Sequence, residues 1–330
     1  MLKAAIIGLG QVGSRFDEEP RKAIWSHAGA YLSLKEIFSL VAGVDLEVQN
    51  QEKFRTRCPL AKVYEDAVEM MTKHKPDVVS ICTPPHGRAR LVEKIVNAVP
   101  PSVLICEKPL ERDPSERSQL LHVCKKANVG LFVNYNRRYS QLYNYAKLVM
   151  QSGSLGDILS VTVCAPNRLW SVGSHAINLL LYLVGEYPEV WHSISLPRLY
   201  EDGEPAVDFI CRFPSGTAGR VLTTGFREAL IFDVDLIGSN ARLSIQSNGT
   251  QVFLRRFKKS LEYVGYSVEQ DPELLYTVDE KESTFIEILA RAADWVMNKK
   301  SAVLLDGVDA LTSENLLDEL MKAERNGHEE

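Results

Sequence analysis

The sequence lacks the features that mark several classes of protein. No apolar run reaches the roughly 18 residues that a membrane-spanning helix needs, and the amino terminus enters a strand-like run without a signal-peptide pattern. The net charge of −5 provides no positive excess for nucleic acid or an anionic membrane. We therefore expect a cytoplasmic protein that binds neither nucleic acid nor membranes.

Cysteine and histidine are too scattered along the chain to predict a metal centre. The chain has six cysteines and seven histidines, with no C-x-x-C pair and no H-x-x-x-H spacing. Cys82 and Cys106 lie inside apolar strand-like runs, where cysteine commonly serves as a small buried hydrophobe. We expect structural thiols and no metal site.

The first 135 residues alternate short apolar strands with helical patterns. Strands are expected over residues 4–7, 39–44, 78–82, 103–106 and 130–134, and helices over 28–36, 67–72, 88–99 and 115–127. Strands this apolar are buried on both faces, which predicts a parallel, doubly wound α/β sheet. The first domain is assigned to residues 1–135.

After residue 136 the pattern changes to alternating strands joined by short turns. Strands are expected over residues 158–164, 206–213, 217–224, 231–237, 241–245 and 250–256, and helices over 141–152, 175–184, 283–297 and 307–324. This pattern predicts a second, α+β domain over residues 136–330. The short turns imply an antiparallel sheet, with a helix against one face.

A glycine-spaced turn, Gly8-Leu9-Gly10-Gln11-Val12-Gly13, follows the first strand. Gly8 permits the tight turn, and Gly10 lets backbone amides approach a pyrophosphate. Gly13 lets the next helix pack closely on the sheet. We predict that this turn, with Gln11 and Val12 between its glycines, binds a dinucleotide.

Asp45 ends the second predicted strand, where a carboxylate accepts hydrogen bonds from the adenosine ribose and repels a 2′-phosphate. Leu46 follows it with no arginine beside it, which favours NAD and leaves NADP possible. Asp45 lies 32 residues after Gly13, against about 20 in the usual motif. The surplus falls in the polar segment 14–25, either a solvated surface insertion or a flap near the pyrophosphate or the substrate.

Two later strands deliver polar groups to the same sheet edge. Thr83, Pro84 and His86 follow the strand over 78–82 and are candidates for the nicotinamide side of the cofactor. As a catalyst His86 is less expected, because a histidine here is more often a loop residue. Glu107 and Lys108 close the strand over 103–106. Lys108 would donate a hydrogen bond to a developing alkoxide, or act as a base if its pKa is lowered.

His175 lies at a glycine-marked helix entrance, Gly173-Ser174-His175, with Asn178 on the same helical face. A histidine here either belongs to the core or faces a cleft.

These motifs resemble the glucose-fructose oxidoreductase / inositol dehydrogenase / rhizopine catabolism (Gfo/Idh/MocA) family nearly end to end. The resemblance implies a Rossmann domain and an α+β domain with an open, mostly antiparallel sheet that has helices on one face. The exposed face of that sheet is expected to form a homodimer or homotetramer. It also implies hydride transfer between NAD(P) and a hydroxyl or carbonyl of a sugar, inositol or nucleotide-sugar. By the same resemblance, Lys108 and His175 are the catalytic lysine and histidine, and Glu107 and Lys108 lie at the cofactor.

The sequence departs from the family pattern around His175. The family commonly has aspartates where this chain has Ser171 and Asn178, and the segment before the histidine, which contains Arg168, is short. Arg138, Arg168, Ser171 and Asn178 are the candidate substrate contacts. The departures leave two hypotheses: a sugar dehydrogenase or reductase, or a catalytically weakened nicotinamide- and sugar-binding protein that acts as a sensor or partner subunit.

Overall fold

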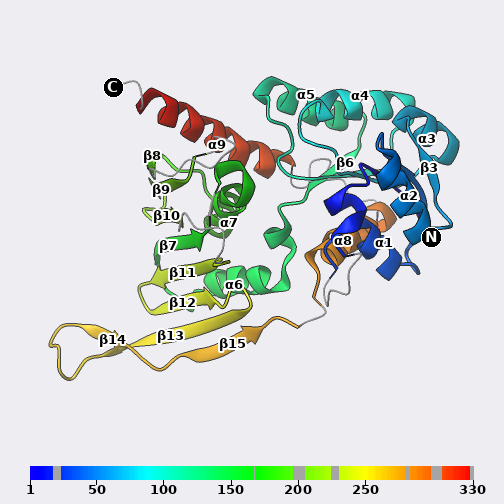
Figure 1. The fold of residues 1–330 in the computed structure, drawn as a ribbon. Helices are drawn as coiled ribbons and strands as arrows, with labels where there is room; N and C mark the ends of the chain where they lie inside the picture. The colour runs from blue at the N-terminus through cyan, green and yellow to red at the C-terminus, as the bar shows by residue number, and fades with distance from the viewer. Residues whose placement is uncertain are drawn as a thin grey trace. The chain divides into compact units, whose positions relative to one another are not determined.

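The computed structural model describes residues 1–17, 24–166, 168–195, 205–223, 230–279, 282–298 and 307–327. The chain forms two compact units (Figure 1). Unit 1 comprises Met1–Tyr139 and Glu280–Leu311, and unit 2 comprises Ser140–Asp279 and Thr312–Glu330. The sequence prediction assigned all of residues 136–330 to one domain, whereas residues 280–311 return to unit 1. A domain boundary placed where the sequence pattern changes cannot show that a later segment packs with the first domain.

Unit 1 contains a six-stranded sheet in the order β3-β2-β1-β4-β5-β6. Its strands are β1 (Leu2–Ile7), β2 (Phe38–Val44), β3 (Lys62–Tyr64), β4 (Val78–Ile81), β5 (Val103–Cys106) and β6 (Gly130–Val133), and every neighbouring pair is parallel. The strand order reverses between β1 and β4. In open parallel sheets this switch point creates a crevice at the carboxyl ends of the strands.

Helices cover both faces of this sheet. One apolar cluster joins it to α3 (Ala67–His74), α4 (Arg88–Ala98) and α5 (Pro114–Lys126). A second cluster, on the other face, joins it to α1 (His27–Ser33), α2 (Val48–Arg57) and α8 (Thr284–Asn298). Helix α8 buries Phe285, Ile288, Leu289, Ala292, Ala293 and Trp295 there, which explains why residues 280–311 belong to unit 1.

Unit 2 is built on a nine-stranded mixed sheet in the order β14-β13-β12-β11-β7-β10-β9-β8, with β15 paired to β13. The strands are β7 (Ile158–Ala165), β8 (Val190–Ser195), β9 (Val207–Arg212), β10 (Ala218–Thr223), β11 (Asp233–Gly238), β12 (Ala241–Gln246), β13 (Gln251–Lys259), β14 (Ser267–Glu269) and β15 (Glu273–Thr277). All pairs are antiparallel except β7 with β10.

One face of this second sheet carries the core of unit 2. Helices α6 (Gln141–Gln151) and α7 (Ser174–Val184), and the part of α9 (Gly307–Gly327) from Thr312 onward, contribute to a single apolar cluster with the strands. The predicted fold class, a doubly wound parallel sheet followed by a mostly antiparallel sheet with helices on one face, is confirmed.

Three further observations concern disulfide bonds, metal sites and membrane-spanning helices. All six cysteines are free thiols. Within the described ranges, no group of His, Cys, Asp and Glu side chains is placed to hold a metal ion. The same part of the chain contains no helix of the length and hydrophobicity that crossing a membrane requires.

Candidate functional site

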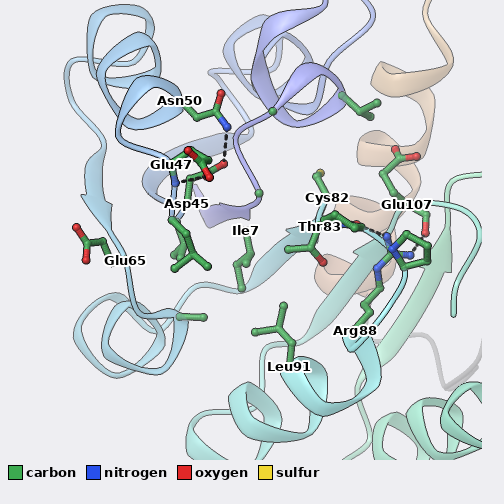
Figure 2. A pocket seen from close by; sticks show the side chains of 18 of the residues that line it. Ile7, Asp45, Glu47, Asn50, Glu65, Cys82, Thr83, Arg88, Leu91 and Glu107 are labelled. Carbon is green, nitrogen blue, oxygen red and sulfur yellow. Dashed lines mark hydrogen bonds between the residues drawn. The ribbon is translucent and has the colours of Figure 1, made fainter.

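A cavity of about 890 Å³ opens at the carboxyl edge of the unit 1 sheet (Figure 2). The glycine turn after β1 and the ends of β2, β4 and β5 all line it. The lining therefore includes Gly8, Gly10, Gln11, Val12, Asp45, Cys82, Thr83, Pro84, Pro85, Arg88, Glu107 and Lys108. It occupies the crevice where the strand order reverses.

The three glycines of the turn differ in the space around the position that a Cβ atom would occupy. Gly8 has φ +92°, and a Cβ added there would lie 2.7 Å from the carbonyl carbon of Cys82. A Cβ on Gly13 would lie 2.0 Å from the carbonyl oxygen of Gly8. A Cβ on Gly10 would meet nothing within 4 Å, and Gly10 lines the cavity. The first and third glycines allow close packing, whereas the second leaves bare backbone at the cavity wall.

The chain does not continue from this turn into a long helix. One wide helical turn (Gln11–Arg15) follows, and α1 begins only at His27, where Ser26 Oγ accepts from the Gly29 amide at 3.0 Å. The intervening segment accounts for the long spacing to Asp45. Asp17 is tied to α2, accepting from Arg57 at 2.8 Å, while residues 18–23 lie outside the described ranges. Surface insertion and flap both stay predictions.

Asp45 lies just beyond β2 and lines the cavity. Its Oδ2 accepts from the Leu9 amide at 2.6 Å and from Asn50 Nδ2 at 3.2 Å, and its Oδ1 accepts from the Glu47 amide at 2.8 Å. A carboxylate offers about four acceptor positions, so about one is left for a ligand. Glu47 and Glu65 line the same side of the cavity (Figure 2), which is therefore acidic.

Glu107 ends β5 among buried polar groups. Its Oε1 accepts from Asn134 Nδ2 at 2.6 Å and lies 3.0 Å from Nε2 of the fully buried His27. Burial is the largest influence and raises the pKa of Glu107. The His27 hydrogen bond and charge, the Asn134 hydrogen bond and the Arg88 charge outweigh burial and hold this pKa below its ordinary value. A carboxylate thus stays ionised beside the cavity.

Lys108 follows Glu107, is half-buried and lines the cavity, and its peptide bond to Pro109 is cis. Thr83 and Pro84 line the cavity from the end of β4, and Thr83 Oγ1 is buried without a hydrogen-bond partner in the described part of the chain. The structure thus gathers the glycine turn, Asp45, Thr83, Pro84, Glu107 and Lys108. Gly13 is buried beneath the turn, and His86 is exposed and not among the lining residues.

The candidates of unit 2 have other surroundings. His175 is the second residue of α7 and is half-buried, Ser171 is exposed and Arg168 is half-buried. Asn178 is 2% exposed, and its Nδ2 donates to Ser313 Oγ at 2.8 Å. Arg138, in unit 1, forms an ion pair with Asp309 at 2.5 Å. Asn178 and Arg138 therefore make structural contacts within their own units.

Sequence reasoning missed Arg88, the buried first residue of α4, which lines the cavity. It also missed the acidic side formed by Glu47 and Glu65, because the short β3 that precedes Glu65 has no apolar pattern. For Arg88, no sequence signal distinguishes a buried arginine at a helix start from an exposed one.

Residues 2–135 match the model of the Gfo/Idh/MocA oxidoreductase family, described as having an NAD-binding Rossmann fold. Among similar proteins, the myo-inositol 2-dehydrogenase of Thermotoga maritima is 22% identical over 271 residues, which span 73% of this chain and 74% of that one. The D-glucoside 3-dehydrogenase of Escherichia coli is 24% identical over 208 residues, 57% of this chain and 55% of that one.

Solved structures agree with the fold along the whole chain. An aldose-aldose oxidoreductase from Caulobacter crescentus, in complex with glycerol, superposes with a TM-score of 0.79 at 17% identity, covering 99% of this chain and 98% of that one. A 3-ketoreductase from Actinomadura kijaniata, in complex with TDP-benzene and NADP, gives 0.73 at 16% identity, with 96% of each chain covered. At such identities the likeness establishes the fold alone. The match over residues 2–135 therefore makes this part of the chain similar to the NAD-binding domain of the Gfo/Idh/MocA oxidoreductase family, and the solved structures agree with it in fold.

Proposed function

We propose that the protein is an NAD-dependent oxidoreductase that transfers a hydride between nicotinamide and a hydroxyl or carbonyl of a sugar, inositol or nucleotide-sugar. One observation carries the proposal. A single cavity contains a bare-backbone glycine turn at the end of β1, a carboxylate at the end of β2 and a lysine at the end of β5. A dinucleotide needs the first two, and carbonyl–alcohol chemistry needs the third.

The residues present fit a dinucleotide. The open wall at Gly10 admits a pyrophosphate against backbone amides, and the remaining acceptor position of Asp45 suits one ribose hydroxyl. Asp45, Glu47 and Glu65 would repel a 2′-phosphate, which favours NAD over NADP. The orphaned Thr83 Oγ1 would gain a partner on the nicotinamide side. When bound, the nicotinamide supplies or accepts the hydride.

Lys108 is proposed to stabilise the negative charge that develops on the reacting oxygen. Its ammonium would donate a hydrogen bond to the alkoxide that develops as the substrate is oxidised or reduced. His175 is the proposed acceptor of the hydroxyl proton in the oxidative direction. Arg168 and Ser171 stay candidates for substrate contacts. Arg138 and Asn178 are not proposed, because each already has a structural partner.

The names of the relatives support the substrate class and the chemistry. They are called dehydrogenases, an oxidoreductase and a ketoreductase, with inositol, glucoside and aldose substrates named for three of them. None of these names suggests a sensor or partner subunit. The alternative of a catalytically weakened binding protein therefore gains no support from them.

A panel of sugars, inositols and nucleotide-sugars tests the proposal by the change in nicotinamide absorbance. With an active substrate, Lys108→Ala should lower kcat by about 10²–10⁴ and leave the Kd for NADH within a few-fold, because the lysine acts on the reacting oxygen. Lys125→Ala, on the exposed side of α5, is the control and should behave as wild type. Full activity of Lys108→Ala would remove this lysine from the mechanism.

A further inference from the structure

The guanidinium of Arg88 joins two loops that line the cavity. Arg88 is the first residue of α4 and is 1% exposed. One terminal nitrogen donates to the carbonyl oxygens of Glu107, Pro109 and Leu110, the last at 3.1 Å. The other donates to the carbonyl oxygen of Thr83 (Figure 2). The carbonyls on both sides of Lys108 are therefore held by one side chain.

The same segment is anchored a second time through the backbone of Arg88. The carboxylate of Glu111, which is 1% exposed, accepts from the Arg88 amide at 3.0 Å and the Ala89 amide at 3.4 Å. A carboxylate at this position caps the first turn of α4 and lies at the positive end of its dipole. The segment from Glu107 to Glu111 thus meets Arg88 at both of its ends.

Only an arginine can make this set of contacts. Carbonyl groups of an irregular loop lie outside the strand and helix ladders and need donors from elsewhere. The guanidinium of Arg88 donates to four of them here. A guanidinium carries five N–H donors in a rigid planar fork, so it can serve carbonyls of two loops at once. A lysine offers its donors from a single atom on a flexible stem. The buried charge costs desolvation free energy, which these hydrogen bonds offset.

We propose that Arg88 is a positioning residue for Lys108. By holding the carbonyl groups of Glu107 and Pro109, the residues on either side of Lys108, and linking them to Thr83, it sets the place of the ammonium relative to the loop after β4. This inference rests on the proposed function, in which Lys108 acts at the reacting oxygen. It predicts that loosening Arg88 impairs turnover more than cofactor binding, because a small displacement of a reacting group is costly.

Arg117 provides a matched control within the same unit. It is fully buried on α5, and it also donates to backbone carbonyls of this loop, at Glu111 (3.0 Å) and Arg112 (3.4 Å). These two carbonyls lie beyond the Lys108–Pro109 peptide. Replacing Arg117 therefore removes a buried arginine of the same kind without releasing the carbonyls that flank Lys108.

The experiment compares Arg88→Lys, Arg117→Lys and wild type in kcat, KM, Kd for NADH and Tm. Both variants should lower Tm, because each loses a buried guanidinium. Only Arg88→Lys should lower kcat, by about 10- to 100-fold, with the Kd for NADH within about three-fold of wild type. Wild-type kcat in Arg88→Lys, or an equal loss in Arg117→Lys, would overturn the proposal. If Arg88→Lys does not fold, Arg88→Gln and Arg117→Gln replace the pair.

A second measurement separates this inference from the proposed function. The rate at which trace acetic anhydride acetylates the Lys108 amine is followed by mass spectrometry, which requires no hydride transfer. Arg88→Lys should change this rate by at least about three-fold, and Arg117→Lys should not. If wild type transfers no hydride to any substrate of the panel, the proposed function fails and the labelling alone decides on Arg88. An unchanged rate in Arg88→Lys would then refute its role.

Discussion

At the scale of single residues, Asp45 combines a structural and a proposed binding role in one carboxylate. It accepts from the amide of Leu9 inside the glycine turn and from the amide of Glu47 after β2. Removing the side chain would leave the part-buried Leu9 amide without this acceptor, at a cost of about 1–3 kcal/mol, whereas the exposed Glu47 amide could bond to water instead. A change in cofactor preference in Asp45→Ala could therefore come from a distorted glycine turn. The test needs a variant that keeps a hydrogen-bond acceptor at residue 45.

We expect Asp45→Asn to relax discrimination between the two dinucleotides by about ten-fold, because the amide keeps one oxygen for the Leu9 amide but removes the charge. Fluorescence titration gives the Kd values for NADH and NADPH. Asp45→Ala, as comparison, should bind both dinucleotides more weakly and unfold at lower urea concentration. The assignment is wrong if wild type already binds NADPH as tightly as NADH.

Glu107 should make the stability of the protein depend on pH in acid. Its folded-state pKa lies below the unfolded value, so ionisation stabilises the fold above the unfolded pKa and this contribution is lost as pH falls through the folded pKa. Between about pH 5 and pH 3, the free energy of unfolding of wild type should fall more steeply than that of Glu107→Gln, by up to ~1.4 kcal/mol per pH unit.

Urea unfolding at a series of pH values measures the difference in slope. The control is Glu262→Gln, which changes a carboxyl in an exposed turn of unit 2 and should follow wild type. Parallel curves for wild type and Glu107→Gln would show that the carboxylate has no preferential stabilisation in the folded state.

At the scale of elements, two glycines of the turn after β1 have different roles: Gly10 is proposed to serve cofactor binding, and Gly13 serves folding. Gly10→Ala adds a methyl group to an open cavity wall, whereas Gly13→Ala drives one into the carbonyl of Gly8. We expect Gly10→Ala to unfold like wild type but to bind NADH at least about ten-fold more weakly, because the methyl group keeps a pyrophosphate from the amides.

Gly13→Ala should instead lose at least about 1–3 kcal/mol of unfolding free energy through overpacking. Urea unfolding and NADH titration of both variants form the test. Equal NADH affinity in Gly10→Ala and wild type would mean that the ligand does not approach the turn.

The elements that the sequence predicted are those with a strong local pattern. The apolar strands, the glycine turn and the polar residues directly after strand ends need only periodicity and chain order, and these define most of the cavity. Helix α2 was missed because Val48 and Phe54 are its only large apolar residues, and β3 because it has three half-exposed or exposed residues. The partners of Arg88, Arg138 and Asn178 depend on tertiary contacts, which no local pattern encodes.

At the scale of the whole molecule, unit 2 presents a sheet face opposite its helices. The exposed side chains of β8, β9 and β10 include Ile194, Ile210 and Leu222 at 57%, 39% and 38%, interspersed with exposed Arg212 and Arg220. The face is therefore mixed rather than continuously apolar. Arginine and large apolar side chains are both enriched in subunit interfaces. On this ground we predict that the face binds a second copy of the chain.

We expect sedimentation at micromolar concentration to give a mass above the 37.0 kDa of one chain. The double variant Ile210→Glu/Leu222→Glu should sediment as a monomer, because two charges would be buried at the interface. Leu261→Glu, at a fully exposed position between β13 and β14, should not change the mass. A wild-type mass of 37.0 kDa would end the oligomer prediction.

The position of α8 has a consequence for how the protein is made. A ribosome releases residues 1–139 well before residues 284–298, on the order of ten seconds at ordinary rates of synthesis. During that interval the nascent Rossmann sheet has one face without the helix that later buries Phe285, Leu289 and Trp295 against it. Unit 1 thus cannot mature before most of unit 2 has been translated. A truncated gene that stops at residue 139 should yield an aggregating product, and a chaperone that shields apolar surface would act on this chain before translation ends.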